Sequence, residues 1–335
     1  MSFTLDKTGL VFTLKILLGT GLAVFFVWFY SDLAFSYIYP QNEPRVESTR
    51  RQNLASAFDP LEKVVGVTLA FVGDIMFDRG VKESIFKNGG GDFNFPFEKI
   101  YEDLKQYDIL FGNLEGPISD RGENQGSLYS FRMDPKTAEA LALAGFDVLS
   151  LANNHIGDWG EEAIKDTIKR LDSAGILVAG ADLTQEEDYL PKILNIRGVK
   201  IAFLAFFNAP EIEIKKSVEL AKLNADIVIA SFHFGDEYKK EPNENQKRLA
   251  RLAVDAGADL VVGHHPHIIQ EVELYKNSYI AYSLGNFIFD QSFSKETMRG
   301  ILLEVVIKDK NITAVTPLQI KINSNFQPEL ISNHE

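Results

Sequence analysis

The sequence of 335 residues predicts a mixed α/β protein whose folded body is a layered α-β-β-α sandwich. From Val67 onward, short apolar runs typical of buried strands alternate with amphipathic stretches of helical period. Several of these runs, such as 226–234 (DIVIASFHF), are apolar almost throughout, as parallel strands are when helices cover them. The C-terminal third contains only strand-like segments, which predict a second, antiparallel sheet packed on a mostly parallel one.

The individual elements follow from their length and period. Apolar runs predict strands at 67–73, 108–113, 146–154, 176–180, 193–206, 226–234 and 259–267. Apolar residues at helical spacing predict helices at 97–106, 135–144, 161–174 and 244–256. The remaining strand-like segments are 268–275, 279–290, 300–308 and 312–320.

Charge and composition narrow the possible partners and ligands. The formal net charge is −13, which repels phosphate backbones and argues against a nucleic-acid partner. The chain has no cysteine, so thiolate catalysis, disulfides and cysteine zinc sites are excluded. Any metal site must therefore use His, Asp, Glu and Asn.

The N-terminal residues 1–39 are expected to form a membrane anchor in contact with lipid. Residues 16–31 carry no charge, and the apolar stretch reaches back to Gly9 if Lys15 snorkels, about the 20 residues that a spanning helix needs. Lys7 and Lys15 precede the run, which places its start on the cytoplasmic side. A cleaved signal peptide is the alternative, although no small-x-small cleavage site follows the run; a buried core helix is a third.

The rest of the chain divides into three parts. Residues 40–63 are polar and contain Pro, Asn and Gln, which predicts a stalk. Residues 64–325 are expected to form the folded domain, and 326–335 a tail. With the anchor oriented as above, the protein is predicted to be a single-pass protein of the cell membrane whose C-terminal domain is extracytoplasmic.

Polar side chains follow five of the predicted strands at the points where those strands end. Because ligand sites of open α/β sheets lie beyond the carboxyl ends of the strands, these side chains are expected to meet in one crevice. They are Asp74, Asp78 and Arg79; Asn113 and Glu115; Asn153, Asn154, His155 and Asp158; His233, Asp236 and Glu237; and His264, His265 and His267.

This mixture of carboxylate, amide oxygen and imidazole suits one or two borderline divalent ions such as Zn, Mn or Fe. Paired ions bridged by a carboxylate support phosphoester hydrolysis, so metal-assisted hydrolysis is the leading chemistry. Simpler interpretations remain open. Asp74 could cap a helix, His155 could sit in a hydrogen-bonded turn, and His265 and His267 could be surface imidazoles.

Six motifs in order resemble the bacterial capsule-synthesis CapA family, which is associated with poly-γ-glutamate capsules and related to calcineurin-like metallophosphoesterases. They are GDIMFDR (73–79), GNLEGPIS (112–119), LANNHIGDWG (151–160), FHFGDEY (232–238), GHHPH (263–267) and YSLGNFIFDQ (282–291). The likeness runs from about Thr68 to Gln291. It implies a metallophosphoesterase-like sandwich with divalent metal ions.

The resemblance also implies roles for individual residues. Asp74 matches the first metal-binding aspartate, and Asn113 or Glu115 occupies the region of the bridging carboxylate. Asn154 matches a metal-binding asparagine, and His155 the histidine that protonates the leaving group. His233, His265 and His267 match the remaining metal ligands.

Two departures from the pattern weaken the implied activity. The usual Asp-x-His becomes Asp74-Ile75-Met76, which loses one imidazole, and the usual Gly-Asp-x-x-Asp becomes Gly112-Asn113-Leu114-Glu115. At least one metal position is therefore open to question.

The geometry around the motifs carries further expectations. Pro266 should force extended backbone on His265, which would place His265 and His267 on the same side and turn His264 away. Asp158, Trp159 and Gly160 are expected to start the next helix.

Four other residues are expected at the substrate. Arg79 and Arg132 could hold a carboxylate or phosphate, or could be surface ion pairs. Glu237 and Asn286 are further substrate-contact candidates, with a turn-fixing role as the alternative for Asn286.

Two functions of different class follow. The first is a membrane-anchored, metal-dependent hydrolase or transferase acting on a phosphoester or an anionic envelope polymer. The second is a non-catalytic, polymer-binding subunit of a capsule synthesis or export complex, with membrane subunits as partners.

Overall fold

The computed structural model describes residues 66–181 and 189–331. The predicted anchor (1–39) and stalk (40–63) lie outside the described residues, as do the last four residues of the chain. Within the described ranges, no helix has the length and apolar character needed to cross a membrane.

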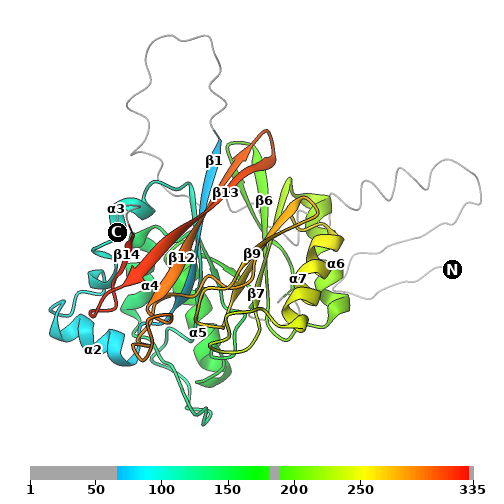
Figure 1. The fold of residues 1–335 in the computed structure, drawn as a ribbon. Coiled ribbons are helices and arrows are strands. Elements are labelled where there is room, and N and C mark those ends of the chain that lie inside the picture. Colours follow the sequence, from blue (N-terminus) through cyan, green and yellow to red (C-terminus); the bar gives the residue numbers. More distant parts are fainter. Residues whose placement is uncertain (1–65, 182–188, 332–335) are drawn as a thin grey trace, which may run out of the picture. The chain divides into compact units, whose positions relative to one another are not determined.

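The first sheet has eight strands and combines both ends of the domain (Figure 1). Its order is β14-β13-β12-β1-β2-β3-β4, with β11 paired beside β1. The strands are β1 (Val67–Ile75), β2 (Ile109–Leu114), β3 (Val148–Ser150), β4 (Leu177–Ala179), β11 (Asn286–Ile288), β12 (Arg299–Lys308), β13 (Asn311–Ile322) and β14 (Pro328–Leu330). Strands β1 to β4 run parallel, whereas β12, β13 and β14 are antiparallel.

The second sheet has six strands in the order β5-β6-β7-β8-β10-β9. They are β5 (Lys192–Ile196), β6 (Val199–Phe206), β7 (Ile227–His233), β8 (Leu260–His264), β9 (Val272–Tyr275) and β10 (Ser278–Ala281). Its four central strands are parallel, and the edge strands β5 and β9 are antiparallel.

The C-terminal strands do not form a sheet of their own, which corrects the predicted division into a parallel and an antiparallel sheet. β12 pairs with β1 from Val67↔Ile307 to Phe71↔Leu303 and so extends the parallel strands. The physical reason is that β1 has β2 on one side only, so its other edge is open to a partner. β14 lies within the residues expected to form the tail, and it pairs with β13.

Helices cover the outer face of each sheet (Figure 1). On the first sheet these are α2 (Arg79–Lys87), the 3₁₀ turn η2 (Phe95–Phe97), α3 (Tyr101–Leu104), α4 (Lys136–Ala144) and α5 (Gly160–Ser173). On the second they are α6 (Glu211–Asn224) and α7 (Glu244–Ala256). Helices α2 and α6 were not expected, and the helix predicted at 97–106 is only a 3₁₀ turn followed by one α-helical turn.

Three apolar clusters make the layers. The central cluster is formed by residues of both sheets, among them Phe71, Phe111 and Phe203, and the Phe111 and Phe203 rings stack with centroids 6.0 Å apart. The two outer clusters join each sheet to its helices. The protein is therefore a mixed α/β fold with two packed sheets, as predicted.

A repeated aspartate sets the register of the parallel strands. Strands β2, β3, β7 and β8 each follow an aspartate whose carboxylate accepts a backbone N–H from the neighbouring strand. The pairs are Asp108 with Thr68 (2.9 Å), Asp147 with Leu110 (2.8 Å), Asp226 with Lys200 (2.9 Å) and Asp259 with Val228 (2.8 Å). Because these bonds fix the amino ends of the strands, the carboxyl ends, with their polar residues, align at the opposite edge.

One of these aspartates gives a pH-dependent prediction. Burial raises the pKa of Asp147 from 3.8 to about 6, although the Leu110 N–H favours the charged form. A raised folded-state pKa means that stability is lost as pH rises between these values. Asp147→Asn keeps an acceptor for Leu110 and removes the buried charge, so it should raise the free energy of unfolding at pH 7.5 by about 1–2 kcal/mol and change little at pH 4. Urea denaturation at both pH values measures this; a variant less stable at pH 7.5 would contradict it.

Candidate metal centre

The carboxyl ends of strands from both sheets meet in one polar cluster. In the first sheet, Asp74 of β1 lies in register with Asn113 of β2 and with Asn286 of β11. In the second sheet, His233 of β7 lies in register with His264 of β8. Side chains from the two sheets touch, since Asn113 Nδ2 lies 3.3 Å from His233 Nδ1.

Asp74 is fully buried and lies at the middle of this cluster. Its carboxylate accepts the Asn113 side-chain amide at 2.8 Å and the His265 backbone N–H at 3.3 Å. Two imidazole nitrogens approach it, His267 Nδ1 at 3.2 Å and His264 Nδ1 at 3.4 Å. Although burial opposes the charge, His264 and His267 hold the pKa of Asp74 well below its usual range.

Glu115 is also fully buried, and neither of its carboxylate oxygens has a hydrogen-bond partner among the described residues. The imidazole Nε2 of His267 lies 3.5 Å from Oε1, and that of His155 lies 3.8 Å away. Burial raises the pKa of Glu115 to about 8. A buried carboxylate without partners is costly, and a bound cation would supply the partner it lacks.

A chain of imidazole and amide groups adjoins the two carboxylates. His233 Nε2 lies 3.0 Å from His265 Nδ1 and 2.7 Å from Asn154 Oδ1. Burial and the neighbouring His265 hold the pKa of His233 well below its usual value. His233 is therefore neutral at physiological pH, which is the form that binds metals.

The ligand-type atoms fall into two groups, each with all of its atoms within 4.8 Å of one another. One is Asp74, Glu115 and His233, and the other is Glu237, His265 and His267. The contact between His233 and His265 joins the groups. Carboxylates and imidazoles in this number fit one or two borderline divalent ions. Glu237 was expected to contact the substrate, but the structure places it among these ligand-type residues.

The backbone of the histidine motif differs from the extended geometry that was expected. His265 has φ +98° and His267 has φ +57°, both in the left-handed region. Proline restricts the preceding residue, but tertiary contacts override that preference here: the His265 N–H reaches Asp74, and His267 Nδ1 lies 3.0 Å from Asn286 Oδ1. Strain of this kind gathers at functional sites.

His155 is held in one orientation from two sides. Its Nδ1 lies 2.8 Å from Asp158 Oδ2, and its ring centroid lies 4.1 Å from that of Phe131. Nε2 therefore remains to face Glu115. The helix expected to start at Asp158, Trp159 and Gly160 is α5, which begins at Gly160 with Trp159 as its N-cap residue. The Asp158 side chain does not cap it, because its carboxylate binds His155, Ser127 and the Phe131 N–H.

Two residues at the site have contacts that sequence reasoning did not predict. Asn153 is buried and bonds the Leu114 carbonyl at 2.8 Å and Asn113 Oδ1 at 3.2 Å, which ties β3 to β2 beneath the site. His264 was expected to turn away, but its Nδ1 lies 3.4 Å from Asp74 Oδ1, although it belongs to neither ligand-type group. Asn153 was expected in the crevice from its position after a predicted strand, but without these bonds to Leu114 and Asn113.

The residues expected to bind substrate are largely engaged by the protein itself. The Arg79 guanidinium pairs with Asp290 and lies 4.7 Å from the Phe131 ring centroid. The Arg132 guanidinium lies 4.0 Å from the ring of Trp159. Asn286 is fully buried, and its contacts with His267, Gln291 and Thr297 are those of a residue that orients an imidazole.

Met76 occupies the position where the resembling pattern has a histidine. It is fully buried, and its sulfur accepts the Asp78 backbone N–H at 3.0 Å. Met76 also packs in the apolar cluster between the first sheet and its helices.

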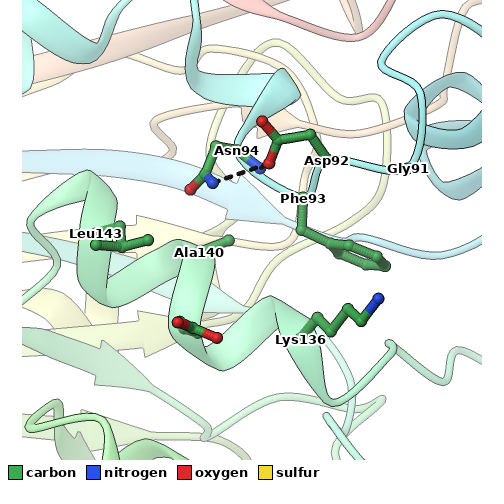
Figure 2. Close-up of a pocket in the computed structure, with 8 residues that line it drawn as sticks. Gly91, Asp92, Phe93, Asn94, Lys136, Ala140 and Leu143 are labelled. Atoms are coloured by element: carbon green, nitrogen blue, oxygen red, sulfur yellow. Dashed lines mark hydrogen bonds between the residues drawn. The ribbon is translucent and has the colours of Figure 1, made fainter.

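Away from this cluster, a pocket of about 240 Å³ lies between α4 and the loop before η2 (Figure 2). Asn94 bonds Asp92 at its edge, and Phe93, Lys136 and Leu143 are among its lining residues. None of the predicted site residues lines it.

The fold and the cluster define a two-sheet α/β protein with a candidate metal centre where the strands of both sheets end. The chain belongs to the family described as bacterial capsule synthesis protein PGA_cap, whose sequence pattern matches residues 68–291.

Known proteins similar to this chain agree with that assignment. A capsule biosynthesis protein CapA from Bacillus anthracis is 35% identical over 77% of this chain and 68% of its own length. A PGA biosynthesis protein CapA from Bacillus subtilis is 35% identical over 76% of this chain and 72% of its own. The crystal structure of a hypothetical protein from Thermus thermophilus shares the fold, with a TM-score of 0.50 and 16% identity over 76% of this chain and 99% of that one.

Proposed function

We propose that this protein is an accessory protein of capsule poly-γ-glutamate biosynthesis that acts as a metal-dependent hydrolase or transferase on the polymer or on a phosphoester linked to it. The names of its CapA relatives support a role in the biosynthesis of the capsule polymer. The cluster of carboxylates and imidazoles at the strand ends supports metal-dependent chemistry. The observation that carries the proposal is Glu115, a fully buried carboxylate beside Asp74 and His233 to which no described residue donates a hydrogen bond.

The chain's own residues suggest how the site would work. Asp74, Glu115, His233, His265 and His267, with Asn113, Asn154 and Glu237 beside them, are the residues that would hold one or two divalent ions such as Mn, Zn or Fe. Such ions would supply Lewis-acid activation of a phosphoryl or acyl oxygen. His155 does not belong to either ligand-type group, and its Asp158 partner keeps Nε2 available to donate a proton to the leaving group.

The test of this function uses the domain without residues 1–39. Elemental analysis should find one or two transition ions per chain, and a generic phosphodiester should be hydrolysed when Mn or Zn is added. If the domain retains metal but turns over no phosphodiester, peptide or γ-linked polyglutamate, the proposal that it is an enzyme is rejected.

The alternative is a non-catalytic subunit that binds the anionic polymer within a membrane complex of capsule-synthesis proteins. The observation that favours it is Met76, which takes the place of an imidazole. Its sulfur accepts a hydrogen bond from the Asp78 backbone N–H and is therefore already engaged. In that case the variants that remove metal should lower polymer binding while no substrate is turned over.

The location is part of the proposal and has its own prediction. We expect residues 1–39 to anchor the chain, with the domain outside the cytoplasm, because Lys7 and Lys15 precede an uncharged run. A reporter enzyme that is active only outside the cytoplasm should be active when fused after Glu335. Activity of a cytoplasm-specific reporter at the same position would contradict the anchor.

A further inference from the structure

Two aromatic rings lie at the surface beside the ligand-type group formed by Glu237, His265 and His267. Tyr238 follows Glu237 and is 42% exposed, and Phe293, in the loop between β11 and β12, is 66% exposed. The two rings meet edge to face with their centroids 5.1 Å apart, and the Tyr238 ring centroid lies 6.2 Å from that of His267. We call Tyr238 and Phe293 the aromatic rim.

Tyr238 is held in place by the candidate site and is connected to one of its imidazoles. Its backbone N–H donates to the Pro266 carbonyl at 2.9 Å, and its backbone is in the left-handed region, with φ +63°. Its hydroxyl accepts Gln291 Nε2 at 3.2 Å. The Gln291 side-chain oxygen accepts Asn286 Nδ2 at 3.1 Å, and Asn286 Oδ1 lies 3.0 Å from His267 Nδ1. Left-handed backbone at a residue other than glycine is costly and gathers at ligand clamps and active sites.

What the aromatic rim leaves available is apolar ring surface. The Tyr238 hydroxyl is engaged by Gln291, and among the described residues the Phe293 ring contacts no aromatic ring other than that of Tyr238. Single exposed apolar side chains are common on protein surfaces, but here two are in contact beside a polar cluster. Aromatic rings bind apolar and planar groups by burial and by stacking, so such a group is the ligand that this surface fits.

The charges beside the aromatic rim favour an uncharged group. Aromatic rings also bind cations, but a cation here would lie beside the divalent ions that Glu237, His265 and His267 would hold, and like charges repel. An anionic group would be drawn to those ions and not to the rings. The other charged side chains within three residues of either ring balance, apart from Asp290, which pairs with Arg79. They are Lys239, Lys240 and Lys295 against Asp236, Glu241 and Glu296.

We propose that the aromatic rim binds an uncharged apolar group of the substrate while a neighbouring anionic group is held at the metal-ligand cluster. The proposal rests on the proposed function and narrows its substrate class. The substrate is then an anion that carries an apolar group close to the phosphoryl or carboxyl group, and not a small, wholly polar ester. An aromatic ring is the most sensitive probe of such a surface, because it adds stacking to burial.

The test compares two inert phosphonates that share the same head group, phenethylphosphonate and ethylphosphonate. Calorimetry on the full chain loaded with Mn or Zn gives the ratio of their Kd values. The compound with the ring should bind about three- to tenfold more tightly, the range expected of one aromatic contact. Phe293→Ala should remove most of this preference, and Phe293→Tyr, which keeps a ring, should retain it.

The matched control is Phe86→Ala. Phe86 is 55% exposed on α2 and also meets another ring, Phe93, edge to face, but it is remote from the ligand-type groups in the sequence and in none of them. This variant should keep the wild-type ratio.

Four results would overturn the subsite. They are equal binding of the two phosphonates, binding of neither, the wild-type preference in Phe293→Ala, and loss of the preference in Phe293→Tyr or Phe86→Ala. The proposed function fails separately, by absence of metal or of turnover in the domain, and these are measured without either phosphonate.

Discussion

His155→Ala should leave the metal content of the domain intact and lower kcat by roughly a hundredfold to ten-thousandfold, the usual contribution of a general acid. The reason is geometric. The ring is fixed by Asp158 and Phe131, its Nε2 lies 3.8 Å from Glu115, and it belongs to neither ligand-type group. Elemental analysis and steady-state kinetics on a phosphodiester measure the two effects.

Two comparisons sharpen this prediction. Asp158→Asn should lower kcat less than His155→Ala, because it loosens the ring and keeps the imidazole. A substrate with a very acidic leaving group should be affected less by His155→Ala, because its departure hardly needs a proton. Loss of metal from the His155→Ala protein would instead identify His155 as a ligand.

Glu115→Gln should abolish tight metal binding while making the metal-free protein more stable. Outer partners of metal ligands are worth about 10- to 100-fold in affinity, so loss of a carboxylate ligand should cost at least about a hundredfold. In the metal-free protein, burial raises the pKa of Glu115 from 4.5 to about 8, so the charged form is disfavoured by folding. Stability of the wild type is therefore lost as pH rises between these values, and the glutamine avoids that loss.

Thermal unfolding with and without added Mn or Zn measures both effects. Without metal, the Tm of Glu115→Gln should exceed that of the wild type at pH 8 by more than at pH 5. With metal, the wild type should gain in Tm and Glu115→Gln should not. Glu139→Gln is the matched control, since Glu139 is exposed on α4 and lies in neither ligand-type group, and it should gain in Tm as the wild type does. Undiminished metal affinity in Glu115→Gln would remove Glu115 from the ligand set.

Much of the fold could be predicted because it is encoded locally. The apolar strands at 67–73, 108–113 and 226–234 were expected, as were the helices at 135–144 and 244–256. Sheet membership could not be predicted in the same way, because the pairing of β12 with β1 joins residues far apart in the chain. Helix α6 was missed although it runs over Glu211–Asn224, since its apolar residues also reach the exposed face, as Leu220 and Leu223 do.

The sequence by itself determined that Asp74 and Asn113 meet at the candidate site, because neighbouring parallel strands of one sheet end at a common edge. The contact of Asn113 with His233 joins the two sheets, so it depends on how the sheets pack. Only the tertiary structure decided how these side chains are oriented and which partners they have. The left-handed backbone at His265 and His267 and the orientation of His155 by Asp158 depend on contacts between separate strands and loops. So does the absence of hydrogen bonds to Glu115 within the part of the chain that the structure describes. Such contacts leave no local pattern, because a side chain's partners depend on the packing of the two sheets and not on its neighbours in sequence.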